Sequence, residues 1–137
     1  MNIKEETMTL ARLAYASNHS GLAAGVLEDI LYVSLSNNER DGITGALIVC
    51  EEDFFQILEG ERTAVSACMT RIMNDPRHQK INIIFAGDVQ TNLFPTWSMH
   101  SIERDVMLCY MVNGDFNPAH ISEGEIVSLC LEMALTN

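Results

Sequence analysis

The stretch DFFQILEG, residues 53–60, is short, apolar and aromatic, with a turn signal at each end, and this pattern predicts a buried β-strand. Alternate residues of a strand point to the same face, so Phe54, Gln56 and Leu58 should share one face. A carboxamide between two apolar side chains costs about 1–3 kcal/mol for each donor or acceptor left unpaired. Gln56 therefore needs either a polar partner in the core or a polar ligand against it.

The segments around this strand predict an α+β domain. Four further strands are expected at 9–17, 46–50, 81–86 and 97–102, and two helices at 22–37 and 62–75. Strands 46–50 and 53–60 are joined by a short acidic turn and should form a hairpin. We expect Glu59-Gly60-Glu61 to break the chain and Asp75-Pro76 to end the second helix. The order βαββαββ predicts one ferredoxin-like sheet with two helices on one face.

Two more apolar helices are expected after the last strand, at 104–112 and 122–135. The second begins with Ser122 and Glu125 at the spacing of a capping box. It is apolar on most sides, so it must pack on the open face of the sheet, on another subunit, or on both. We therefore expect one domain over residues 1–104 and a C-terminal helical extension over residues 105–137.

Composition limits the classes of function. The chain has 137 residues, 47% of them apolar and 20% charged, with a net charge of −11, which fits one globular domain. So acidic a chain is not expected to bind nucleic acid or an anionic membrane. No apolar run is long enough to span a bilayer, and the start, MNIKEET, does not resemble a signal peptide. The four cysteines lie far apart in apolar runs, as reduced thiols of a cytoplasmic protein do, and the histidines predict no metal site.

Several polar residues stand where the predicted core would place them together. Tyr15 lies mid-strand, and if its strand neighbours that of Gln56, the two side chains meet on the helix-covered face. The apolar face of the first helix leads into Asn37 and Asn38 at its expected end, and Gly42 and Gly45 permit unusual backbone angles in the loop that follows. Taken singly, each of these residues also has an ordinary structural explanation.

Five stretches, in this order along the chain, resemble the BLUF family, the sensors of blue light using flavin. They are RLAYAS at 12–17, NNERDGITG at 37–45, FFQILEG at 54–60, NDPRH at 74–78 and FPTWSM at 94–99. The similarity covers roughly residues 9–104, and the chain resembles the short, stand-alone members with two C-terminal helices.

The resemblance implies a flavin held without a covalent bond between the two long helices. FAD is expected, with FMN and riboflavin as alternatives. Tyr15 matches the tyrosine that donates an electron to the excited flavin, and Gln56 matches the glutamine that bridges that tyrosine and the ring. The other implied cofactor contacts are Ile30, Asn37, Asn38, Arg71, Ile72, Asp75, Arg77 and His78, with Arg71 and Asp75 expected to pair at i, i+4 spacing.

The resemblance also implies how the signal leaves the site. Trp97 and Met99 match the switching segment of the fifth strand. On this interpretation the protein is a photoreceptor and not an enzyme, it signals to a downstream protein, and it forms a homo-oligomer. It is expected to remain in the cytoplasm.

Two other functions stay open on the sequence. The first is a light-independent, ferredoxin-like regulatory or ligand-binding module, which would tolerate Gln56→Leu. The second is an acylphosphatase-like hydrolase, which needs a basic, anion-binding loop after the first strand. The turn Asn18-His19-Ser20-Gly21 has no Arg or Lys, so the sequence disfavours the hydrolase.

Overall fold

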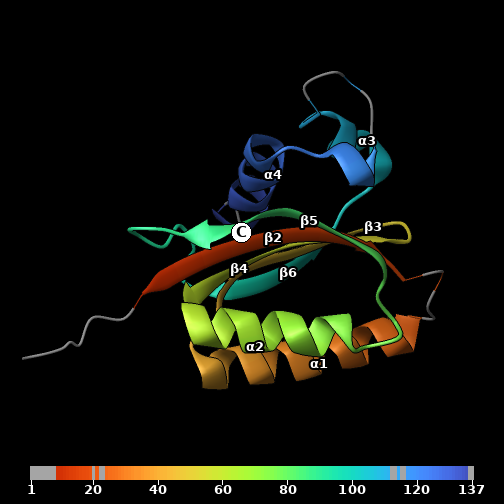
Figure 1. The fold of residues 1–137 in the computed structure, drawn as a ribbon. Helices are drawn as coiled ribbons and strands as arrows, with labels where there is room; N and C mark the ends of the chain where they lie inside the picture. The colour runs from red at the N-terminus through yellow and green to blue at the C-terminus, as the bar shows by residue number, and fades with distance from the viewer. Residues whose placement is uncertain (1–8, 20, 22–23, 112–113, 115–116, 136–137) are drawn as a thin grey trace, which may run out of the picture.

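The computed structural model describes residues 9–19, 21, 24–111, 114 and 117–135. One five-stranded sheet lies between two layers of helices (Figure 1). Its strands are β2 (Leu10–Asn18), β3 (Thr44–Cys50), β4 (Asp53–Glu61), β5 (Gln79–Asp88) and β6 (Trp97–Ser101). The helices are α1 (Ala24–Asp41), α2 (Arg62–Met73), α3 (Arg104–Leu108), the short 3-10 helix η1 (Pro118–His120) and α4 (Glu123–Leu135).

The strand order is β5-β2-β4-β3-β6, which confirms the predicted ferredoxin-like α+β sheet. Strand β2 pairs antiparallel with both β4 and β5, and β3 forms the expected antiparallel hairpin with β4. The last strand, β6, adds to the edge parallel to β3. Strand β4 thus lies at the middle of the sheet, and its residues 54–60 are all buried.

The two faces of the sheet hold separate cores. Helices α1 and α2 lie side by side under one face, as predicted, and α4 covers part of the other (Figure 1). On the α1/α2 face, the buried apolar residues include Leu47, Phe54 and Leu58. On the α4 face, Phe55 and Ile57 pack in one cluster with residues of α4. Helix α4 thus packs on the face of the sheet opposite α1 and α2.

Several predicted boundaries were wrong. The chain does not break at Glu59-Gly60-Glu61, because β4 continues to Glu61, whose side chain caps α2 by accepting the N–H groups of Thr63 and Ala64. A strand that ends directly in a helix cap needs no loop. Helix α1 continues to Asp41, so Asn38 lies inside the helix. Helix α2 ends at Met73, before the expected residue 75, and α3 ends at 108, before the expected residue 112.

The capping box of α4 is present as predicted. Ser122 Oγ accepts the N–H of Glu125, and Glu125 Oε1 accepts the N–H of Ser122. The expected first residues of α1, at 22 and 23, lie outside the described residues. No helix among those described is both long enough and apolar enough to cross a membrane.

Candidate functional site

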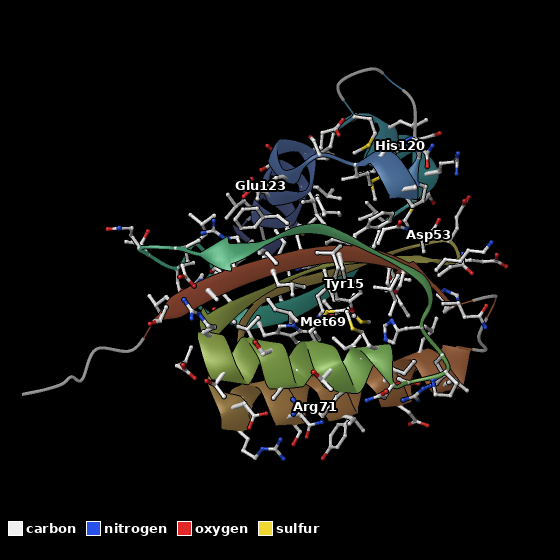
Figure 2. The ribbon with its side chains drawn as sticks, viewed as in Figure 1. Tyr15, Asp53, Met69, Arg71, His120 and Glu123 are labelled. Carbon is white, nitrogen blue, oxygen red and sulfur yellow. The ribbon has the colours of Figure 1, made fainter. Side chains whose placement is uncertain are left out.

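Tyr15 and Gln56 lie opposite each other in the pairing of β2 with β4, on the face covered by α1 and α2. Both side chains are buried, and Tyr15 Oη donates a hydrogen bond of 2.5 Å to Gln56 Oε1. Figure 2 shows Tyr15 pointing from the sheet toward the two helices. Burial raises the pKa of Tyr15 well above its usual value, and the nearby Cys68 and Asp75 raise it further. The phenol therefore keeps its proton, which is shared with the carboxamide.

A cavity of about 230 Å³, open to solvent on one side, lies between α1, α2 and the sheet. Nine of the ten cofactor contacts implied by the sequence line it, and Tyr15 lies behind them, bonded to Gln56. The cavity is lined by Ile30, Val33, Ser34, Asn37, Asn38, Leu47, Gln56, Cys68, Arg71, Ile72, Asp75, Arg77 and His78.

Two buried carboxamides present donors to this cavity. Gln56 uses its oxygen to accept the Tyr15 hydroxyl, and Asn38 uses Oδ1 to accept the thiol of Cys68 at 3.6 Å. Among the described residues, neither Gln56 Nε2 nor Asn38 Nδ2 has a protein acceptor. Each of these amide N–H groups can donate to a group in the cavity, so a ligand with carbonyl or ring-nitrogen acceptors fits here.

The charged groups of the cavity pair differently from the prediction. Arg71 Nη2 bonds Asp41 Oδ2 at 3.1 Å, and Asp75 instead bonds Arg77, with Nη2 at 2.7 Å and Nε at 2.9 Å. The predicted Arg71–Asp75 pair was wrong because α2 ends at Met73, so Asp75 is no longer one helical turn from Arg71. The hydrogen bond from Arg77 holds the pKa of Asp75 below its usual value.

His78 joins the cavity to the Tyr15 strand. Its Nδ1 lies 2.9 Å from Ser17 Oγ, and its ring stands edge-on to the ring of Tyr15, with centroids 6.1 Å apart. Burial lowers the pKa of His78 from its usual value, which favours the neutral form of the imidazole.

Trp97 and Met99 lie on the same face of the sheet as Gln56, but neither lines the main cavity. Leu47 stands between them and the site, since it is opposite Gln56 on one side and Met99 on the other. Trp97 is buried and lines a neighbouring cavity of about 250 Å³, which Asn38 also borders. Within the described part of the chain, Trp97 Nε1 is a buried donor without a partner.

Sequence reasoning missed Val33, Ser34, Leu47 and Cys68, which also line the cavity, and Asp41, which holds Arg71. Val33 and Ser34 could have been found, because they lie one helical turn from Ile30 and Asn37. The contact of Cys68 with Asn38 joins two helices across 30 positions of sequence, and no local pattern signals it.

The chain is similar to known proteins both in sequence and in structure. A family model described as BLUF, sensors of blue light using FAD, matches residues 10–100. The dark-state structure of BlrB, a BLUF protein, has a TM-score of 0.73 and 30% identity, covering 95% of this chain and 98% of that chain. The ground-state structure of BlsA has a TM-score of 0.75 and 27% identity, covering 93% of this chain and 89% of that chain.

The curated proteins that match this chain in sequence are much longer than it is. Photoactivated adenylate cyclase subunit beta from Euglena gracilis is 28% identical over 104 residues, which are 74% of this chain and 12% of that protein. This chain therefore spans a small part of the curated relatives it matches, and nearly the whole of BlrB.

Proposed function

Because this chain belongs to the BLUF family, whose members bind flavin to sense blue light, we propose that it switches a Tyr15–Gln56 hydrogen-bond network when a bound flavin is illuminated. The observation that carries the proposal is the hydrogen bond from the buried Tyr15 to Gln56 at the wall of the cavity between α1 and α2. The chain is a photosensor and not an enzyme, since the match covers residues 10–100 and the cyclase activity of the larger relatives belongs to their other domains.

The residues of the cavity fit a flavin, and we propose FAD as the natural cofactor. Ile30 and Ile72, which face the cavity from α1 and α2, supply apolar surfaces for a planar ring system. The free amide donors of Asn38 and Gln56 match the carbonyl and nitrogen acceptors of its pyrimidine edge. Asn37, Arg71, Asp75, Arg77 and His78 are proposed to hold the polar parts of the cofactor.

When bound, a flavin absorbs blue light and supplies an excited-state one-electron oxidant. Tyr15 is the proposed electron donor, because it is the buried phenol bonded to the cavity wall. A phenol that loses an electron becomes a strong acid, and its hydrogen bond directs the proton to Gln56 Oε1. The cycle closes when the electron and a proton both return to Tyr15, and Gln56, which has both donor and acceptor atoms, would then be left rotated or tautomerised. The donor that it presents to the cavity is then different, although no covalent bond to the protein has formed.

The altered amide gives the protein a second state whose population light controls. We propose that Trp97 and Met99 respond to it, because they lie on the same face of the sheet, and that β6 conveys the change to a downstream protein. The four cysteines are free thiols, which supports a cytoplasmic location. The homo-oligomer expected from the sequence stays a prediction.

The first experiment is an absorption spectrum of the purified protein before and after a blue flash. We expect a yellow protein whose blue band moves to longer wavelength and returns in the dark. Chromatography of the cofactor released by denaturation should identify FAD and not FMN. A colourless protein that takes up no added FAD, FMN or riboflavin would contradict the proposal.

A second prediction concerns the orientation of Asn38. Cys68→Ala removes the thiol that donates to Asn38 Oδ1, so the amide is free to turn, and we expect flavin affinity to fall about five-fold, as for loss of roughly 1 kcal/mol. Cys68→Ser keeps a donor at the same position and should retain most of the affinity. Titration of the flavin-free protein with FAD measures both. Equal affinities for the two variants would show that the thiol does not orient Asn38.

A further inference from the structure

A buried carboxylate lies on the far side of the sheet from the cavity. Glu59 is 0% exposed, and it belongs to β4, the strand that also carries Gln56. Its Oε2 accepts Arg12 Nε at 2.7 Å, and its Oε1 accepts the backbone N–H groups of Leu93 at 2.8 Å and Phe94 at 3.0 Å. Both oxygens are therefore paired, as a buried charge requires.

These bonds fix the loop between β5 and β6. Arg12 Nη2 also reaches the carbonyl oxygen of Thr91 at 3.4 Å, and the N–H of Gly45 donates to the carbonyl oxygen of Thr96 at 3.1 Å. The loop is thus bonded to the sheet near its start, its middle and its end. It leads directly into Trp97, the first residue of β6.

Phe94 connects the same loop to the C-terminal helix. Its side chain is buried in the apolar cluster on the α4 face of the sheet. That cluster also contains Ile126, Leu129 and Cys130 of α4. A change in the position of the loop therefore alters the surface on which α4 packs, because packed cores transmit small displacements.

The pairing of β2 with β4 joins this carboxylate to the photoactive pair. Arg12 is opposite Glu59 in that pairing, and Tyr15 is opposite Gln56. The two pairs lie three positions apart, so they occupy opposite faces of the same two strands. A change in the Tyr15–Gln56 hydrogen bond that displaces β2 against β4 would therefore also change the geometry of the Arg12–Glu59 hydrogen bond.

From these contacts we infer that Glu59 is a positioning residue that couples the Tyr15–Gln56 pair to α4 through Leu93 and Phe94. The inference rests on the proposed function, since it assigns a route for the same light response. A stabilising role alone explains the carboxylate poorly, because a buried ion pair is on average no more stabilising than well-packed apolar side chains of the same volume.

The test compares hydrogen–deuterium exchange in the dark and under blue light in the flavin-bound protein. In the wild-type chain, illumination should change exchange in peptides covering 89–96 and 123–135. In Glu59→Gln the amide oxygen can still accept the N–H groups of the loop, but the amide NH₂ faces Arg12 Nε. Both of these groups are donors, so the hydrogen bond to Arg12 is lost. This variant should keep its flavin and its red shift, while the light-minus-dark difference over 123–135 falls about five-fold or more, which is the lower end of usual coupling factors.

Glu52→Gln is the matched control, because it makes the same change of charge at an exposed position on the β3–β4 turn. It should behave as the wild-type chain does. An unchanged light-minus-dark difference in Glu59→Gln, or loss of its flavin, would overturn the inference. If Glu59→Gln does not fold, the wild-type protein tests the inference by itself. A wild-type protein that shows the red shift but no light-dependent change in hydrogen–deuterium exchange over 89–96 and 123–135 also overturns the inference. A wild-type protein without a red shift would instead contradict the proposed function.

Discussion

Replacing Tyr15 by Phe is expected to give a yellow, folded protein whose absorption no longer shifts under blue light. The ring of Tyr15 is wholly buried, and Phe fills the same volume. Tyr15 does not line the cavity, so flavin binding should persist. What is lost is the hydroxyl that donates to Gln56 Oε1, and with it the electron donor and the path of its proton. Leaving Gln56 Oε1 without this donor should lower stability by about 1–3 kcal/mol.

The matched control is Tyr32→Phe. It removes the same hydroxyl from a side chain on α1 that is 75% exposed. Absorption spectra recorded before and after a blue flash should show the full shift in Tyr32→Phe and none in Tyr15→Phe. A shift of normal amplitude in Tyr15→Phe would mean that the electron comes from another residue, and the proposed mechanism would be wrong.

Gly45→Ala is expected to have the largest effect on stability. Gly45 has a φ of +141°, which side chains rarely allow, and a Cβ there would lie 1.9 Å from the carbonyl oxygen of Ile57. That oxygen belongs to the central strand β4, so it cannot move without disturbing the β3–β4 hairpin. We expect the free energy of unfolding to fall by about 3 kcal/mol or more, because backbone strain and overpacking act together.

Urea denaturation followed by circular dichroism measures this loss as a lower midpoint. Gly25→Ala on α1 is the control, because a Cβ there meets nothing within 4 Å and the φ is ordinary. Its stability should stay the same or rise slightly, since Ala favours helix more than Gly does. Equal midpoints for the two variants would show that β3 can shift away from β4 at Gly45.

Much of the site followed from the two-residue period of the central strand. That period placed Gln56 between Phe54 and Leu58 on one face, and the antiparallel pairing of β2 with β4 then brought Tyr15 opposite. The cavity between α1 and α2 was expected from the family resemblance, and the helical spacing of its lining residues is consistent with it. Local periodicity is reliable here because the residues concerned lie in long, regular elements.

The errors arose where side chains from distant segments compete for one partner. The spacing of Arg71 and Asp75 suggested a pair within one helix, but Arg71 binds Asp41 across the α1–α2 interface. Glu59 was expected at a break in the chain, because the Gly60 that follows it is a residue type that often interrupts regular structure. Hydrogen bonds from Arg12 and from the N–H groups of the loop offset the free-energy cost of burying the Glu59 carboxylate. None of these partners is close to Glu59 in sequence.

The spacing of Gln56 and Glu59 along β4 limits how this strand can evolve. The two residues are an odd number of positions apart, so the amide points to the cavity and the carboxylate to the α4 side. Inserting or deleting one residue between them would turn one group to the wrong side, setting a carboxylate in the light-sensitive pocket or an amide against Arg12. A one-residue change in the length of this segment is therefore expected to be tolerated less well in descendants of the chain than a conservative substitution at Ile57 or Leu58.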